Sequence, residues 1–306
     1  MDYDVLIIGG GAAGLSGGLV LARSRRKIAV LDAGEPRNEP AGHVHGYLSR
    51  DGITPVEFFE TGRAEVRRCG GEIVPARVVG AKPADPEGFS ISLDDGRELT
   101  ARGLLVATGL ADELPDIPGL RERWGDDVLH CPYCHGYEVR DRPLAVLGGD
   151  NRPFTMHQAQ LVRQWSADVV FFPNTIEPTD EERRRLEARD VEVVDGPVAR
   201  LVPGAGGLAG VELADGRVVP REVAFVGPQF LPRDQLLGEL GCERGENGWV
   251  AVDPSGRTSV PGVWAAGNVV DNPAQLVNAA AEGMTAGIAL NHHLLAEDVE
   301  AALAAT

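Results

Sequence analysis

The chain has 306 residues, of which 43% are hydrophobic and 25% are charged, and its formal net charge is −17. Roughly two domains of ~150 residues fit this length, and the composition is ordinary for a soluble globular protein. An acidic surface repels phosphate backbones, which argues against a nucleic-acid partner. No apolar run approaches the ~20 residues that a membrane-spanning helix needs, and the N-terminus lacks the charged leader of a signal peptide. We therefore expect a cytoplasmic protein without a membrane partner.

The N-terminal segment has the alternation of a βαβ unit. Tyr3–Ile8 is a short apolar run, typical of a buried parallel strand. A helix is predicted for residues 15–24 and a second strand for residues 27–32. This order favours a parallel sheet covered by helices.

A glycine pattern lies between the first strand and the helix. Gly9, Gly11 and Gly14 form G-x-G-x-x-G, and the second strand ends in Asp32. The first glycine allows a tight turn, the second lets the backbone approach a pyrophosphate, and the third lets the helix pack on the strand. The helix N-terminus faces the phosphates, and Asp32 can accept a hydrogen bond from a ribose hydroxyl. The pattern predicts a dinucleotide site.

The centre of the chain carries a C-x-x-C pair. Cys131 and Cys134 are flanked by His130 and His135. Two thiols at this spacing can close and reopen a disulfide, but half of a zinc site has the same spacing, and inert packing is a third interpretation. The remaining cysteines are isolated: Cys69 and Cys242. A redox pair is favoured because a structural zinc site needs two further ligands, and the flanking histidines crowd the same few residues. We expect no metal.

Further elements follow the first βαβ unit. A helix is predicted for residues 55–69, and short strands between residues 73 and 95 are separated by turn formers at 83–86. Residues 103–109 form a buried strand that ends in a turn of small residues, which lets the backbone pass close to a flat cofactor. His43 and His45 lie in a loop, where they either approach an active site or are satisfied at the surface.

A second strand–turn–helix begins at residue 143, with its next strand at residues 167–172. It resembles a copy of the first unit, but the three glycine positions of the G-x-G-x-x-G motif are occupied by Gly148, Asp150 and Pro153. The carboxylate of Asp150 opposes pyrophosphate oxygens, and Pro153 adds bulk where a helix packs tightly. We expect this unit to keep its architecture while losing its ligand.

Arginines that could grip a 2′-phosphate are missing directly after residues 171–174. The three arginines at 183–185 follow acids on a helix capped by Thr179, as in a solvated helix. Strands are predicted at residues 191–202, 211–220 and 224–227.

The C-terminal part completes the first unit. Residues 263–268 form a strand that ends at a glycine turn, and a long alanine-rich helix begins near Pro273. The N-terminus of this helix, near residues 272–275, could point at a cofactor and stabilise negative charge.

These motifs together resemble the low-molecular-weight thioredoxin reductases over essentially the whole chain. The resemblance implies an α/β fold of two Rossmann-like nucleotide-binding domains. Residues 1–114 and 229–306 would form the FAD domain, and residues 115–228 an inserted pyridine-nucleotide-like domain that carries the C-x-x-C pair. The FAD-binding residues that it implies are Gly9, Gly11, Ala12, Ala13, Gly14, Asp32, Ala107, Thr108, Gly109, Gly267, Asn268 and Gln275.

The resemblance also implies the catalytic roles. Cys134 would lie against the flavin, Cys131 would be the interchange thiol that meets the substrate, and His135 would replace the aspartate acid/base of thioredoxin reductases. Imidazole can do that work near neutral pH. Asn268 stands where the family usually has an aspartate, and of the usual Arg-Gln pair only Gln275 is present.

The altered second glycine motif and the Cys-x-x-Cys-His sequence are more similar to thioredoxin reductase-like dithiol oxidases of the gliotoxin and holomycin type. We therefore expect an FAD-dependent thiol–disulfide oxidoreductase with weak or no NADPH use, in which oxygen or another acceptor reoxidises the flavin; a different electron donor such as ferredoxin is also open. The alternatives are an NADPH-dependent thioredoxin reductase and, from another class, a non-enzymatic flavoprotein or zinc-held interaction module. The expected partners are a small dithiol or disulfide, or a thioredoxin-like protein, and the resemblance implies a homodimer.

Overall fold

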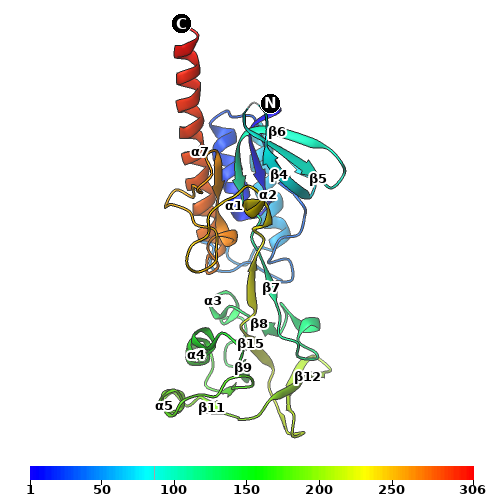
Figure 1. Cartoon of the computed structure of the whole chain (residues 1–306). Coiled ribbons are helices and arrows are strands. Elements are labelled where there is room, and N and C mark those ends of the chain that lie inside the picture. The colour runs from blue at the N-terminus through cyan, green and yellow to red at the C-terminus, as the bar shows by residue number, and fades with distance from the viewer. Residues whose placement is uncertain (86) are drawn as a thin grey trace. The chain divides into compact units, whose positions relative to one another are not determined.

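Figure 1 shows the computed structural model, which describes residues 1–85 and 87–306. Pro86, in the turn predicted at residues 83–86, lies outside the described residues. The chain divides into two compact units. Unit 1 comprises residues 1–39, 54–111 and 231–306, and unit 2 comprises residues 40–53 and 112–230.

Unit 1 is built on a mostly parallel sheet in the order β3-β2-β1-β6-β5-β4, with β17 pairing to β6. β1 lies between β2 and β6 and is parallel to both, whereas β4 and β5 pair antiparallel. The strands are β1 Tyr3–Ile8, β2 Ile28–Asp32, β3 Glu72–Pro75, β4 Val78–Pro83, β5 Phe89–Leu93, β6 Glu98–Val106 and β17 Val263–Ala265. The helices are α1 Ala12–Arg23, α2 Pro55–Arg68, α6 Gln235–Glu239, the short η3 Gly267–Val269 and α7 Leu276–Ala304.

The central strands of unit 1 are mostly apolar and largely buried because helices cover the sheet. Every residue of β2 is buried, and α1 and α7 pack closely together. Glycine makes this approach possible, since a Cβ at Gly283 would lie 1.9 Å from the carbonyl oxygen of Ala13. The backbone contact fixes the N-terminal end of α7 against α1.

Unit 2 contains a five-stranded parallel sheet in the order β11-β10-β9-β15-β8 and a three-stranded antiparallel sheet of β12, β13 and β14. The strands are β8 Val128–Leu129, β9 Leu144–Leu147, β10 Val169–Phe172, β11 Glu192–Val193, β12 Val198–Gly204, β13 Gly207–Leu213, β14 Val218–Val219 and β15 Val223–Val226. The helices are η1 Arg121–Arg123, α3 Pro132–His135, α4 Arg152–Leu161, η2 Val162–Gln164 and α5 Asp180–Glu187. The two segments that connect the units, β7 Leu110–Glu113 and β16 Gln229–Pro232, pair with each other.

Most predicted elements are present, and the two βαβ units confirm the Rossmann-like α/β prediction. The strand predicted over residues 191–202 is wrong as a single element, because β11 ends at Val193 and β12 starts at Val198. Gly196 between them has a φ of +130°, which breaks an extended strand. The helix over residues 180–187 begins as predicted, with Thr179 and Glu182 forming a capping box.

Candidate active site

The redox turn lies in unit 2, directly after β8. Cys131 and Cys134 are joined in a disulfide. Cys131 is the N-cap of α3, Pro132 occupies the first turn, and the Cys134 N–H donates to the Cys131 Sγ at 3.2 Å. A donor at this sulfur favours its thiolate once the disulfide opens. The C-x-x-C pair therefore forms the disulfide that a redox-active pair of cysteines can form.

An aromatic surface flanks the disulfide. Tyr133, between the two cysteines, is 67% exposed, and its ring meets that of Trp165 edge-on at 5.8 Å. Trp165 can pack on the turn because Gly136 has no side chain: a Cβ there would lie 2.7 Å from the indole ring. Neither aromatic residue is among the predicted site residues, although an aromatic residue between two cysteines is a signal in the sequence.

His135 ends α3 and follows Cys134 directly. Burial lowers the pKa of His135, the charge of His45 lowers it further, and Glu138 acts in the opposite direction. A lowered pKa keeps the imidazole neutral near neutral pH, where it can accept a thiol proton.

Different surroundings are found for three histidines whose roles the sequence leaves open: His43, His45 and His130. His45 lies 3.4 Å from a carboxylate oxygen of Asp51 and 3.6 Å from one of Glu138, so the structure brings it to the same turn as His135. His43 is exposed. His130 instead stacks on Phe154. Asp51 and Glu138 are not among the predicted site residues.

The first glycine loop in unit 1 has the shape of a phosphate cradle. Gly9 has a φ of +113°, and a Cβ there would lie 2.3 Å from the carbonyl oxygen of Ala107. A Cβ at Gly14 would lie 1.9 Å from the carbonyl oxygen of Gly9. Gly11 caps α1 without a side-chain hydrogen bond, and nothing lies within 4 Å of its Cβ position. An open helix N-terminus behind a glycine loop fits the pyrophosphate of a dinucleotide.

Asp32 closes the other end of this cradle. Its carboxylate is buried, and it accepts hydrogen bonds from the Gly34 N–H at 2.9 Å and from Arg63 Nε at 2.8 Å. A Cβ at Gly10 would lie 2.1 Å from the Asp32 Cγ, so the carboxylate borders the glycine loop. Each carboxylate oxygen has two lone pairs, and the site therefore fits the ribose of FAD. Arg63 was not among the predicted residues.

Elements from distant parts of the sequence border the same cradle. A Cβ at Gly267, whose φ is +77°, would lie 2.9 Å from the Ala13 Cβ. Gln275 is the N-cap residue of α7, and the first turn of this helix has no acid. Thr108 donates its hydroxyl to the Arg233 carbonyl at 2.7 Å, and Gly109 follows with a φ of +70°. The predicted residues Gly9, Ala13, Asp32, Ala107 and Gly267 thus meet in unit 1.

Asn268 makes contacts within the protein. Its Nδ2 donates to the carbonyl oxygens of Asp271, Asn272 and Ala274, and its Oδ1 accepts from Arg37 at 3.3 Å. These bonds shape the loop before α7. A contact to the flavin chain stays a prediction.

The second glycine loop, in unit 2, is filled by side chains. Gly148 is required because a Cβ there would lie 1.8 Å from the Pro173 carbonyl oxygen. Beside it, the Asn151 side chain caps α4 by accepting from the Phe154 N–H at 3.2 Å. The Phe154 ring packs on Gly227, where a Cβ would lie 2.7 Å from the ring.

The ring of His130 adds to the aromatic packing at the second glycine loop. Its ring stacks on Phe154 with centroids 5.2 Å apart and meets Phe230 edge-on at 5.1 Å. The residues lie at the carboxyl ends of β8, β9 and β15, where open α/β sheets bind their ligands. Three aromatic rings and a capped helix N-terminus thus lie together at these strand ends of unit 2.

Comparison with known proteins agrees with this arrangement. Residues 3–283 match the family described as pyridine nucleotide-disulphide oxidoreductase. The chain belongs to this family. Thioredoxin reductase sirT of Leptosphaeria maculans is 31% identical over 98% of this chain and 96% of its own, and thioredoxin reductase tcpT of Claviceps purpurea is 33% identical over 96% and 95%. The crystal structure of HlmI has a TM-score of 0.94 and 53% identity, covering 99% of this chain and 95% of that one. An oxidoreductase from Agrobacterium tumefaciens has a TM-score of 0.89 and 37% identity, covering 96% and 99%.

Membership confirms the predicted resemblance to low-molecular-weight thioredoxin reductases. The protein is a thioredoxin reductase-like oxidoreductase acting on sulfur groups, and its family implies a flavin cofactor. Within residues 1–85 and 87–306, no three His, Cys, Asp or Glu side chains form a metal-binding group. A zinc-held module would need Cys131 and Cys134 as thiolates, whereas they are joined in a disulfide. Across the part of the chain that the structure describes, no helix is long and apolar enough to cross a membrane.

Proposed function

We propose that this protein is an FAD-dependent thiol–disulfide oxidoreductase that oxidises a dithiol through the Cys131–Cys134 pair, with weak or no use of NADPH. One observation carries the proposal: the Phe154 ring fills the space beside Gly227 at the second glycine loop. His130 and Phe230 pack around this ring. Asp150 adds a carboxylate that opposes phosphate oxygens. The intact cradle of unit 1, by contrast, fits FAD.

The thiol chemistry follows from the redox turn. A substrate thiol would attack the Cys131 Sγ, which forms one S–S bond, breaks the Cys131–Cys134 bond and leaves Cys134 as a thiolate. His135, kept neutral by burial, would accept the proton of the attacking thiol. The second substrate thiol would then attack the mixed disulfide, releasing the oxidised substrate and Cys131 as a thiol. Two electrons thus move from the substrate dithiol to the cysteine pair.

FAD, when bound, supplies the acceptor for this electron pair. Molecular oxygen or another acceptor would finally receive the two electrons. Gly9, Gly11 and Gly14 would hold its pyrophosphate at the α1 N-terminus, and Asp32 its ribose. The N-terminus of α7, which follows the N-cap residue Gln275 and has no acid in its first turn, would stabilise negative charge. The cysteines other than the redox pair are isolated, so the chain has no framework of structural disulfides. A single reversible disulfide is compatible with the reducing cytoplasm, which is the location that we propose.

The substrate is a small-molecule dithiol or disulfide, or a thioredoxin-like protein. The exposed Tyr133, braced by Trp165, supports a substrate with an apolar or aromatic surface next to its sulfur atoms. An NADPH-dependent thioredoxin reductase is the second candidate. It is supported by the names of sirT and tcpT and by the parallel βαβ framework that unit 2 keeps.

The discriminating experiment is an anaerobic titration of the flavin absorbance with NADPH, NADH and dithiothreitol in separate cuvettes. We expect bleaching by dithiothreitol and none by either pyridine nucleotide. Prompt bleaching by NADPH would refute the dithiol-oxidase proposal and make thioredoxin the first substrate to test.

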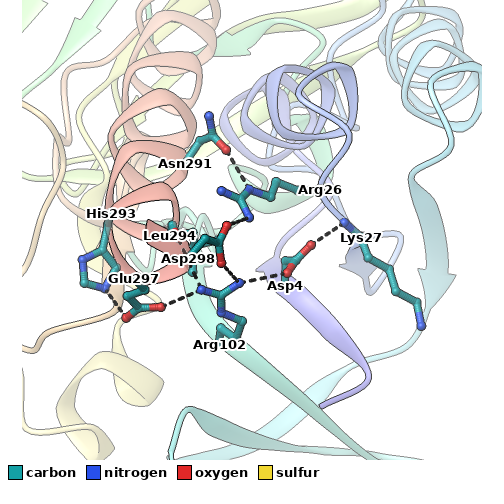
Figure 2. A network of polar contacts seen from close by, with 9 residues as sticks. All are labelled: Asp4, Arg26, Lys27, Arg102, Asn291, His293, Leu294, Glu297 and Asp298. Carbon is teal, nitrogen blue, oxygen red and sulfur yellow. Dashed lines mark hydrogen bonds and ion pairs between the residues drawn. The ribbon is translucent and has the colours of Figure 1, made fainter. Parts of the chain in front are cut away.

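We further propose a homodimer that forms along α7. One side of this helix is tied to unit 1, because Asp298 pairs with both Arg26 and Arg102 at 2.7 Å (Figure 2). The other side carries exposed apolar residues spaced by seven or four positions, which places them on one helical face. These residues are Val277, Met284, Ile288, Leu295, Val299 and Leu303.

A second copy of the same helix would bury this face. Met284→Glu combined with Leu295→Glu is expected to convert the dimer to a monomer in analytical ultracentrifugation. Glu300→Gln, on the same helix but outside the apolar residues, serves as the control. A dimer that survives the double substitution would refute α7 as the interface.

A further inference from the structure

Arg63 is a charged residue on the buried face of α2. It lies four residues after Phe59 and three before Val66, which places these three side chains on one side of the helix. Phe59 and Val66 are buried, and the Arg63 side chain is only 14% exposed. Arginine rarely occupies such a position unless it is paired. The reason for this arginine therefore lies in its partner, the carboxylate of Asp32.

Both contacts from Arg63 go to the same oxygen atom of Asp32. Nε donates to Oδ2 at 2.8 Å, and Nη2 lies 2.7 Å from the same oxygen. Among the described residues, Oδ1 accepts from the Gly34 N–H alone, at 2.9 Å. Each carboxylate oxygen has two lone pairs, so Arg63 occupies both of those on Oδ2, whereas Oδ1 keeps one. Asp32 can therefore accept one further hydrogen bond, through Oδ1.

This ion pair lies at the glycine loop of unit 1. A Cβ at Gly10 would lie 2.2 Å from Asp32 Oδ2 and 2.6 Å from Oδ1, and the Asp32 side chain is 9% exposed. Taking two charges out of water is costly, and replacing a buried ion pair by apolar residues often leaves stability unchanged or higher. Stability alone therefore gives no reason for an ion pair at this place, whereas a role at the cofactor cradle does.

The guanidinium of Arg63 is itself held in place. Its Nη1 donates to Glu60 Oε1 at 2.9 Å, within the same helix. The helix packs on α1 at Gly62, where a Cβ would lie 3.0 Å from the Leu15 Cδ1. The helix contact and the contact with Glu60 together fix the side from which Arg63 approaches Asp32.

We propose that Arg63 is a positioning residue for FAD: by holding Oδ2 of Asp32, it leaves Oδ1 to accept a hydrogen bond from a single hydroxyl of the adenosine ribose. The inference rests on the proposed binding of FAD in unit 1. The adenosine ribose has a 2′-hydroxyl and a 3′-hydroxyl, and a carboxylate with both oxygens available could accept from each. With Oδ2 occupied, the protein distinguishes between the two hydroxyls, and Arg63 produces this distinction through Asp32.

The test measures cofactor affinity rather than turnover. The full-length protein is freed of flavin, and flavin fluorescence gives the dissociation constants of FAD and of its 2′-deoxyadenosine and 3′-deoxyadenosine analogues. Arg63→Leu is compared with Arg67→Leu, which removes the same charge from an exposed position one turn further along α2. Glu60→Gln is a second control, because it changes the outer partner of Arg63 and leaves Asp32 in place.

In the wild type, one deoxy analogue should bind about tenfold more weakly than FAD, as expected for one hydrogen bond to a charged group, and the other should bind within about twofold of FAD. In Arg63→Leu the carboxylate is no longer held, so FAD should bind about tenfold more weakly, and the loss caused by the sensitive deoxy substitution should shrink to about twofold or less. Arg67→Leu and Glu60→Gln should keep the wild-type pattern.

Equal effects of the two analogues on the wild type would overturn the proposal, and this comparison needs no variant, so it holds even if Arg63→Leu does not fold. An undiminished loss in Arg63→Leu would also overturn it, because a residue that only stabilises the fold would weaken FAD and the deoxy analogues by the same factor. Failure of the proposed function has a different signature. Dithiothreitol would then not bleach the bound flavin, whereas the two deoxy analogues would still differ in affinity and the difference would still depend on Arg63.

Discussion

The ring of Phe154 packs directly on the backbone of Gly227, so that the first turn of α4 is pressed against the end of β15. A nucleotide-binding loop leaves this space for its ligand, because the phosphates sit between the strand ends and the helix N-terminus. Here the space is used for packing, and His130 continues the aromatic contact toward the redox turn. In the proposed function, the second Rossmann-like unit therefore serves as a scaffold for the cysteine pair.

The contact predicts an asymmetric response at two nearby glycines. A Cβ at Gly227 would lie 2.7 Å from the Phe154 ring, whereas one at Gly149 would meet nothing closer than 3.7 Å. Gly227→Ala is therefore expected to lower the free energy of unfolding by about 1–3 kcal/mol through overpacking. Gly149→Ala should have a smaller effect. Urea denaturation followed by circular dichroism measures both, and equal losses would contradict the packing of Phe154.

Local patterns in the sequence were sufficient to predict the glycine cradle, the redox pair and most strands. Gly9 and Gly14 could be assigned because each role depends on a fixed spacing within one βαβ unit. The same approach identified Asp150 and Pro153 as departures, but it did not find Phe154. The direction of that ring depends on the backbone at Gly227, which is distant in sequence.

Contacts between distant segments could not be predicted from the sequence either. His45 meets Glu138 only because residues 40–53 fold onto unit 2. Arg63 meets Asp32 because α2 packs beside the end of β2. Neither contact has a characteristic spacing, so composition and periodicity could not predict them.

The contact between α1 and α7 predicts a dependence of FAD binding on Gly283. A Cβ there would lie 1.9 Å from the Ala13 carbonyl oxygen, and backbone cannot move aside cheaply. Gly283→Ala should separate the two helix N-termini, lower the free energy of unfolding by about 3 kcal/mol or more, and release FAD. Gly238→Ala, where nothing lies within 4 Å of the Cβ position, is the control and should keep FAD. Flavin retained after gel filtration measures the outcome, and full retention in Gly283→Ala would contradict the close helix contact.

The ion pairs in Figure 2 predict a pH-dependent contribution to stability. The Arg26 hydrogen bond, and then that of Arg102, lower the pKa of Asp298 below its usual 3.8. A carboxyl with a lowered pKa in the folded state adds stability above its unfolded pKa, and that stability is lost as the pH falls through the folded value. Asp298→Asn should therefore lower the melting temperature at pH 7 by roughly 1–3 °C, since the pair is partly exposed.

As the pH falls from 7 through the folded-state pKa of Asp298, the difference between Asp298→Asn and the wild type should shrink, because the wild-type carboxyl becomes protonated. Glu300→Gln, on the same helix and outside the network, is the comparison. Scanning calorimetry over a series of pH values from 7 toward acid measures the effect. A difference that grows toward acid would contradict the sign derived from Arg26 and Arg102.

The proposed order of the two cysteines predicts different behaviour from single substitutions. Cys131→Ser should leave FAD bound, because the cradle lies in unit 1, yet abolish disulfide exchange, since no sulfur remains for the substrate to attack. The expected rate of flavin reduction by dithiothreitol is lower by at least about 1,000-fold, because serine cannot form the mixed disulfide. Cys69→Ser, at a half-buried free thiol outside the redox turn, should retain the wild-type rate. Exchange that persists in Cys131→Ser would show that Cys131 is not the attacked sulfur, and a trapped mixed disulfide at Cys134, read by mass spectrometry, would then reverse the assignment of the pair.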